Sequence, residues 1–198
     1  LIQLLDGQVS NILKASGRTV GGNEGAYAQL SRLSAFQDSL QKKSSVFLML
    51  AEASGMMTIE DQANLFPMID YHLIRALLRL GCIEIEEEKL RSSLLQKERV
   101  EPTIEQEIRE RVKTVCALLV EQTHLPLIQV DNLLWSHARS ECRHAPVCLP
   151  DNRPENPSFN EFTDTKFNGT CPFQSWCPGA HDAQYRDLWA PLTETENY

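Results

Sequence analysis

The chain has 198 residues, of which 42% are hydrophobic and 23% charged, so it can bury a core and is not disordered throughout. Its net charge is −8, the opposite of what non-specific polyanion binding requires, so a nucleic-acid role would depend on a local basic face. No apolar run approaches the roughly 20 residues of a membrane span. Because Asp6 interrupts the first apolar stretch, residues 1–20 lack a signal-peptide pattern, and we expect a cytoplasmic protein without a membrane partner.

The spacing of apolar residues predicts an all-α fold. In chain order, helices are expected over 1–13, 26–39, 44–53, 68–81, 104–122 and 128–140, with a glycine-rich loop over 17–25 and an acidic connector or short helix over 83–96. Gly55 fits the end of the third helix, and Thr58 with Asp61 resembles a capping box. Pro67 fits the first turn of the helix over 68–81. No segment alternates cleanly enough between apolar and polar residues to predict a strand.

The composition changes after Cys142. Residues 142–178 contain six of the ten prolines and four of the six cysteines, few aliphatic residues and no helical period. A segment that buries so little apolar area needs another source of stability. The other two cysteines, Cys82 and Cys116, fall on apolar helical faces and are expected to be small buried hydrophobic residues.

Four cysteines form two pairs: Cys142 and Cys148, then Cys171 and Cys177. Five residues separate the members of each pair, and twenty-two separate the pairs. In a chain without a secretory signal, this pattern favours metal ligation over disulfides. Zinc sites usually place two to four residues within a pair, whereas a [4Fe–4S] cluster is wider and tolerates a longer spacing. The sequence therefore predicts an iron–sulfur cluster, with zinc as the alternative.

Two stretches resemble the endonuclease III family of base-excision DNA glycosylases. The helix Met68-Ile-Asp-Tyr-His-Leu-Ile-Arg-Ala-Leu-Leu-Arg-Leu-Gly81 resembles that family's Val-Asp-Thr-His helix, and Leu133-Leu-Trp-Ser-His-Ala-Arg-Ser-Glu-Cys142 with Cys171-Pro-Phe-Gln-Ser-Trp-Cys177 resembles its iron–sulfur loop. Other stretches, among them Asp70-Tyr71, Arg79-Leu-Gly81 and Asp131-(x)2-Leu-Trp135, are similar to the queuosine salvage N-glycosidases. The resemblance implies a glycosylase-like helical domain over 1–140, a proline-rich four-cysteine cluster loop over 141–180 and a C-terminal tail over 181–198.

The chain also departs from these families. Where endonuclease III has a Leu-Pro-Gly-Val-Gly hairpin that contacts DNA phosphate, this chain has Ala53-Ser-Gly-Met-Met-Thr-Ile-Glu60, with one glycine. No lysine lies between Leu48 and Pro67, so a lyase step is not expected. In the family the four cysteines lie close together, whereas here about twenty extra residues separate the second from the third.

The resemblance implies an N-glycosidase that removes a base from DNA or from a modified nucleoside or nucleotide, with a structural cluster. Asp70 would be the carboxylate that stabilises positive charge on the sugar, although an aspartate at a helix start is also a common cap. The candidate substrate-binding residues are Tyr71, His72, Arg75, Asp131 and Trp135. Three of them also have a structural interpretation: His72 as a structural helical histidine, Arg75 as a partner of Glu84 and Trp135 as a core residue. The alternative function is a non-catalytic metal-binding module that engages nucleic acid or a protein partner.

Overall fold

The computed structural model describes residues 10–149, 152, 166–167 and 169–194, and its regular structure is helical, which confirms the all-α prediction. The elements are α1 (Ser10–Ala15), α2 (Ala26–Leu30), η1 (Ser34–Phe36), α3 (Lys42–Ala53), η2 (Gln62–Asn64), α4 (Tyr71–Arg79), α5 (Glu88–Gln96), α6 (Pro102–Thr123), α7 (Leu127–Ser140), α9 (Pro178–His181) and α10 (Ala183–Arg186). Within this part of the chain, β pairing is limited to an isolated parallel bridge between Arg99 and Leu192. None of the described helices has the length and apolar character needed to cross a membrane.

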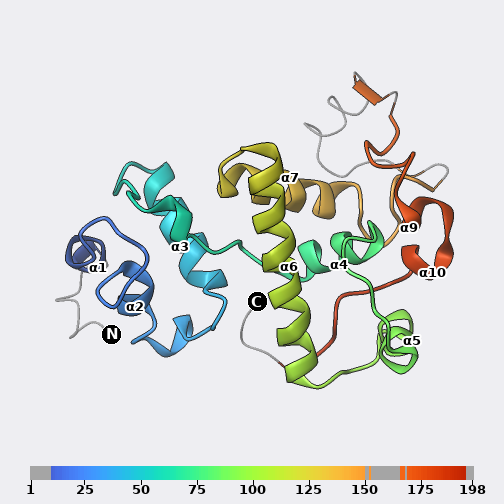
Figure 1. Cartoon of the computed structure of the whole chain (residues 1–198), viewed down its shortest axis with the longest axis horizontal. Helices are drawn as coiled ribbons and strands as arrows, with labels where there is room; N and C mark the ends of the chain where they lie inside the picture. The colour runs from blue at the N-terminus through green and yellow to red at the C-terminus, as the bar shows by residue number, and fades with distance from the viewer. Residues whose placement is uncertain (1–9, 150–151, 153–165, 168, 195–198) are drawn as a thin grey trace.

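Two hydrophobic clusters organise the molecule. Helices α1, α2 and α3 lie at one end of the view in Figure 1 and surround a first cluster that includes Leu30, Leu48 and Ile59. The second cluster is larger and lies among α4, α5, α6 and the C-terminal segment, with Leu73, Leu77 and Val112 near its centre. Leu188 and Ala190 are also buried in it. The described part of the segment expected as a tail is therefore packed against the core.

Buried polar contacts join the two ends of the molecule. The Arg109 guanidinium on α6 donates from Nη1 and Nη2 to the two carboxylate oxygens of Asp38, at 2.8 and 2.6 Å, and both side chains are almost wholly buried. Glu105, one turn earlier on α6, lies 3.6 Å from the same guanidinium. The Tyr27 hydroxyl, from α2, accepts a hydrogen bond from the Phe66 amide at 3.0 Å. These contacts fix the segment that leads into α3 against α6.

Helix α4 begins where Asp70 caps it. The Asp70 carboxylate Oδ1 accepts from the amides of His72 and Leu73, at 2.8 and 3.1 Å, and so satisfies two of the first amides of the helix. Residues 73–79 are all buried, so both apolar and arginine side chains of α4 point into the protein. The predicted helix over 68–81 is thus present but shorter, since Pro67 precedes the cap instead of occupying the first turn.

Helix α9 packs tightly against the end of α4. Gly81 has a φ of +71°, and a Cβ there would lie 3.0 Å from the Pro178 ring. A Cβ on Gly179 would lie 2.9 Å from the Arg79 carbonyl oxygen. Both glycines are therefore needed for the close approach of the two segments, because a side chain at either position would push α9 away.

Several other sequence predictions are confirmed. Helix α3 covers the predicted 44–53, and Gly55 follows it with a φ of +74°. Helices α6 and α7 match the predictions over 104–122 and 128–140 to within two residues at each end. The predicted loop at 17–25 is non-helical, and Cys116 is buried on α6. Of the helix expected over 1–13, residues 1–9 lie outside the described part of the chain, and α1 continues to Ala15.

Three predictions are wrong. The helix expected over 26–39 ends at Leu30, because the Ser31 hydroxyl bonds the Tyr27 carbonyl and the chain becomes extended at Leu33. Asp61 does not cap a helix with its side chain; its carboxylate accepts from the amides of Val20 and Gly21 instead. Cys82 is exposed in the turn after α4 and is not a buried hydrophobic residue.

Loss of the buried Arg109 charge should strongly destabilise the fold. Arg109→Met leaves the Asp38 and Glu105 carboxylates buried without their cation, and we expect the free energy of unfolding to fall by about 3–5 kcal/mol in urea denaturation followed by circular dichroism. The control is Arg99→Met, which removes a pair with Glu194 whose side chains are 75% and 82% exposed and should change stability far less. Equal losses in the two variants would contradict this assignment.

Candidate metal centre

Helices α4 and α7 lie side by side and run in the same direction. Near their starts, the Asp131 carboxylate of α7 accepts from the Met68 amide at 2.8 Å, and the Trp135 indole donates to Asp70 Oδ2 at 3.1 Å. Near their ends, Arg79 of α4 reaches the residues that follow α7. The helix pair therefore carries two groups of candidate residues, a carboxylate pair at one end and cysteines at the other.

Two buried arginines of α4 hold the chain where α7 ends. Arg75 donates to the carbonyls of Cys142, at 3.0 Å, and Ala138, at 2.9 Å. Arg79 donates to the Arg143 carbonyl at 2.6 Å and lies 4.0 Å from the Cys142 sulfur. The Ala138 carbonyl lies in the last turn of α7, and those of Cys142 and Arg143 lie just beyond its end, where a cation is favourable. Both arginines are 3% exposed, so protein carbonyls, and not Glu84, are their partners.

The four predicted ligand cysteines meet at one cavity. Cys142 and Cys148 follow α7, Cys171 and Cys177 precede α9, and all four line a small cavity of about 20 Å³. The same cavity is lined by Arg79, Arg186, His137 and Glu141. All four cysteines are free thiols. The fold thus brings together two cysteine pairs that lie far apart in the sequence, as the metal-ligand hypothesis requires.

The thiols differ in their acidity. Burial would raise the pKa of Cys142, but hydrogen bonds from His137 and the charge of Arg79 outweigh burial and lower it. Burial, together with the neighbouring Glu141, Cys142 and Cys148, raises the pKa of Cys171 to about 12. Burial and the surrounding thiols also raise the pKa of Cys148 and Cys177. Four such groups crowded together repel one another as thiolates, and a bound cation would offset this repulsion.

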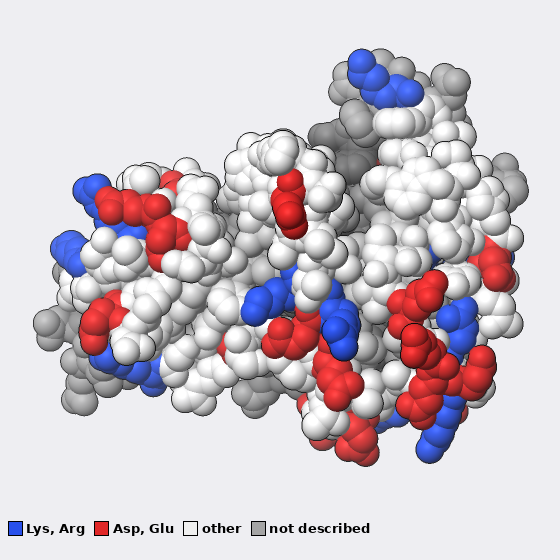
Figure 2. Space-filling model, in the orientation of Figure 1, with Lys and Arg blue, Asp and Glu red and all other residues white. Residues whose placement is uncertain are grey.

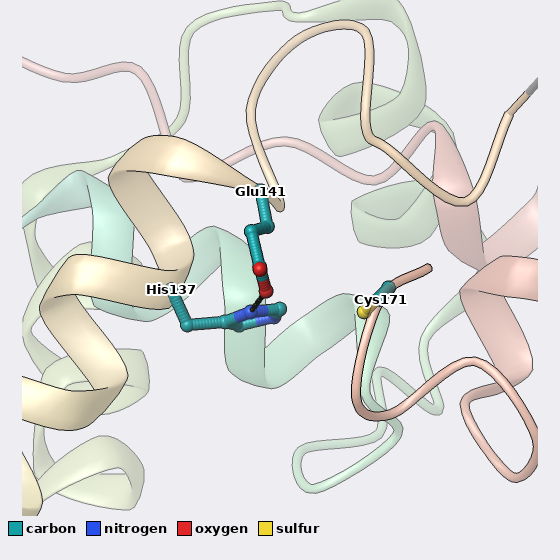
Figure 3. Close-up of side chains that lie close together, drawn as sticks. All are labelled: His137, Glu141 and Cys171. Carbon is teal, nitrogen blue, oxygen red and sulfur yellow. Dashed lines mark hydrogen bonds and ion pairs between the residues drawn. The ribbon is translucent and has the colours of Figure 1, made fainter. Parts of the chain in front are cut away.

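A histidine and a glutamate that the sequence analysis did not single out as site residues lie beside these thiols. Figure 3 shows His137 and Glu141, one turn apart on α7, facing the loop that carries Cys171. Ligand atoms of the three side chains lie within 4.8 Å of one another. The signal in the sequence was a histidine and a glutamate four residues apart, directly before a cysteine. The sequence analysis did not use this signal, because the four spaced cysteines already form a complete ligand set.

The second group is a pair of buried aspartates. Asp70 is 7% exposed, and its two oxygens accept three hydrogen bonds, two from backbone amides and one from Trp135. Asp131 is wholly buried, and its Oδ2 has no hydrogen-bond partner among the described residues. Burial raises the pKa of Asp131 to about 6; the Met68 amide opposes this shift and the charge of Asp70 adds to it. The pair thus contains one firmly held carboxylate and one that takes up a proton easily.

The remaining candidate residues are distributed around this pair. Tyr71 is 43% exposed and its ring stacks on His72, with centroids 4.1 Å apart. His72 also meets Trp135 edge to face at 6.3 Å and contacts Arg75 through Nδ1. The structure therefore brings Tyr71, His72, Asp131 and Trp135 to the neighbourhood of Asp70. The Arg75 guanidinium points away from this group and toward the end of α7.

Comparison with known proteins adds no relative. No family model, curated protein or solved structure matches the chain. The resemblance to endonuclease III and to the queuosine salvage proteins therefore depends on the motif residues quoted above and on nothing further.

The raised pKa of Asp131 makes stability depend on pH. Between about pH 4 and pH 6 the folded protein keeps a proton on Asp131 that the unfolded chain has lost, so the free energy of unfolding should fall as the pH rises. With an unfolded pKa of about 3.9, the penalty at neutral pH is about 3 kcal/mol. Asp131→Asn removes it, and denaturation at several pH values should show the variant gaining stability relative to wild type as the pH rises. A difference that stays constant with pH would contradict the assignment; Asp182→Asn, on exposed α10, is the control.

Proposed function

We propose that the chain binds a [4Fe–4S] cluster through Cys142, Cys148, Cys171 and Cys177. The observation that carries this proposal is that all four cysteines line one cavity although twenty-two residues separate the two pairs. The cluster's role is structural: it fastens the segment that carries α9 and α10 onto α4 and α7. When bound, an iron–sulfur cluster can also carry an electron, which the fastening role does not need.

The cysteine spacing and the charges around the thiols favour a negatively charged [4Fe–4S] cluster over a single zinc ion. A pair spacing of five residues is long for a single zinc ion and is tolerated by a wider cluster. A cluster held by four thiolates carries net negative charge, and Arg79 and Arg186 line the cavity. Burying that charge requires such cations nearby, because isolated ions lose their hydration in the interior.

Zinc remains the alternative metal at this site. The close approach of His137, Glu141 and Cys171 offers nitrogen, oxygen and sulfur donors that suit a single zinc ion. The two metals differ in colour and stoichiometry, so metal analysis separates them.

Metal content tests the proposal directly. Protein purified without oxygen should be brown, absorb broadly in the visible range and contain about four irons per chain. Cys171→Ser should lose most of the iron, because serine replaces a thiolate ligand, whereas Cys82→Ser should keep it, since Cys82 is exposed outside the cavity. Colourless wild-type protein with one zinc would reject the cluster but keep the ligands. Equal iron in both variants would reject the ligand assignment.

A second function, hydrolysis of an N-glycosidic bond at Asp70, is favoured by the aspartate pair. Enzymes that cleave glycosidic bonds use two carboxyl groups whose surroundings push their pKa values apart. Here three donors hold the Asp70 carboxylate in place, and burial raises the pKa of Asp131 to about 6. The substrate class is a base in DNA or a modified nucleoside or nucleotide, as the resemblance implies.

The chemistry assigns a distinct task to each aspartate. As the bond between the sugar carbon and the base nitrogen breaks, its electron pair leaves with the base and positive charge develops on the sugar. The Asp70 anion would stabilise this charge. Water then adds to the sugar carbon, and its proton ends on the released base. Asp131 is wholly buried, so it would act on the reaction through its charge state beside Asp70. The indole of Trp135 would keep the Asp70 carboxylate in place.

The same contacts also favour the non-catalytic alternative. Asp70 is a complete helix cap, and a capped, 7% exposed carboxylate has a structural role without any substrate. On the face shown in Figure 2, acidic side chains gather over α5, and Glu84, Glu86 and Glu87 line a groove there with Glu107 and Glu110. That region would repel DNA, so a polyanion would have to approach elsewhere.

Turnover by Asp70→Asn distinguishes the enzyme from the module. The protein would be screened on abasic, mismatched and deazaguanine substrates. On any substrate that wild type cleaves, Asp70→Asn should lose about 10²–10³-fold in rate, because asparagine removes the charge while its one oxygen keeps the two cap hydrogen bonds. Stability should fall by about 1–3 kcal/mol, since asparagine caps a helix nearly as well but leaves the Trp135 indole without its acceptor.

The matched control is Asp182→Asn, which alters the cap of α10 and should leave turnover unchanged. Equal turnover in the two variants would reject Asp70 as the catalytic carboxylate.

A further inference from the structure

The His137–Glu141 pair lies at the wall of the cysteine cavity and is not used by the four-thiolate ligand set. Both side chains are at least 96% buried, and both line the cavity. Their ring and carboxylate converge on the loop of Cys171 in Figure 3. A buried ion pair of this kind is costly to desolvate, so its position beside the thiols calls for an explanation.

Glu141 fixes the orientation of the imidazole. His137 Nδ1 lies 2.6 Å from Glu141 Oε2, a short, charge-assisted hydrogen bond. Because Nδ1 donates to the carboxylate, the other ring nitrogen, Nε2, is directed away from Glu141. This carboxylate–histidine arrangement is the one that commonly supports metal sites, where it sets the tautomer and angle of the ring.

The imidazole lies beside the ligand sulfurs. Ligand atoms of His137 and Cys171 lie within 4.8 Å of each other, and His137 lines the same cavity as all four cysteines. Arg79 Nη1 lies 4.0 Å from the Cys142 sulfur and lines that cavity as well. Side chains that can donate hydrogen bonds therefore gather at the wall of the cysteine cavity.

Packing holds the ring in this position. Phe173, between the second pair of cysteines, meets the His137 ring edge to face, with centroids 4.6 Å apart and planes at 88°. Glu141 Oε1 has no hydrogen-bond partner among the described residues, so that oxygen is buried beside the cavity without a donor. The pair is thus anchored on α7 and covered by the loop that carries Cys171.

We propose that His137, oriented by Glu141, is a positioning residue of the metal centre whose second ring nitrogen donates a hydrogen bond to a neighbouring ligand thiolate. The inference rests on the proposed metal centre and adds a residue to it. A hydrogen bond to a ligand sulfur stabilises the thiolate over the thiol, which favours metal retention, and it offsets negative charge on the centre, which makes reduction of a cluster easier.

The test replaces the pair by apolar side chains of similar size. The double variant His137→Phe/Glu141→Leu keeps a ring against Phe173 and leaves no unpaired buried charge, so it should fold. Glu141→Gln keeps the ring but weakens its support. The control is His181→Gln, an exposed histidine on the adjacent helix α9. Circular dichroism would establish that all variants are folded.

Two measurements are made on each variant. Competition with a chelator gives the affinity for Co²⁺, a probe for the thiolate ligands, and we expect the double variant to bind roughly 10–100-fold more weakly than wild type. Redox titration of the iron-loaded protein should give a more negative reduction potential in the double variant. Glu141→Gln should lie between, and His181→Gln should match wild type.

The outcomes separate this inference from the metal centre itself. Wild-type protein that binds neither metal would reject both. If wild type binds metal and the double variant has the same affinity and potential, the inference alone fails. A nitrogen ligand in the X-ray absorption spectrum of the cobalt-loaded protein would overturn the hydrogen-bonding role, because it would make His137 a direct ligand.

Discussion

The second half of the molecule depends on two guanidinium groups buried beneath the end of α7. Arg75 and Arg79 would be unstable in the interior without partners, and they find them in backbone carbonyls of Ala138, Cys142 and Arg143. Side chains of α4 thus donate hydrogen bonds to the backbone carbonyls at and just beyond the end of α7. It also determines where Cys142 lies, since its carbonyl is bonded from both arginines. The ring of Trp189 stacks against the two arginines and Lys97, which ties the C-terminal segment to the same point.

The two groups of candidate residues are therefore mechanically connected. Asp70 starts α4 and Arg79 ends it, so one nine-residue helix spans from the aspartate pair to the cysteines. On α7, Trp135 contacts Asp70 and His137 lines the cysteine cavity, so this helix also connects the two groups. A change in the packing of the C-terminal segment would reach Asp70 through α4, because the helix is buried along its length and cannot shift at one end alone.

Periodicity identified the helices that have a long, continuous apolar face, which is why α6 and α7 could be predicted closely from the sequence. It failed between residues 26 and 39, where serine hydroxyls compete for backbone carbonyls and a buried Asp38 needs Arg109, seventy-one residues away. The cysteine set could be named from spacing alone. The His137–Glu141 pair could not, because nothing local distinguishes a surface ion pair from one that a distant loop will cover. Likewise, the buried position of Asp131 depends on the approach of Met68.

The distribution of the ligands also bears on how such a chain diverges. Each cysteine pair is anchored to its own helix, the first to α7 and the second to α9. The entropy of closing the intervening loop grows only with the logarithm of its length, by about 0.6 kcal/mol for each doubling. A longer or shorter connection between Cys148 and Cys171 would therefore change the free energy of forming the proposed centre little, whereas a change in the five residues within a pair would move a thiol relative to its helix. A chain with a compact cysteine segment and a chain with a long one could thus hold the same kind of centre.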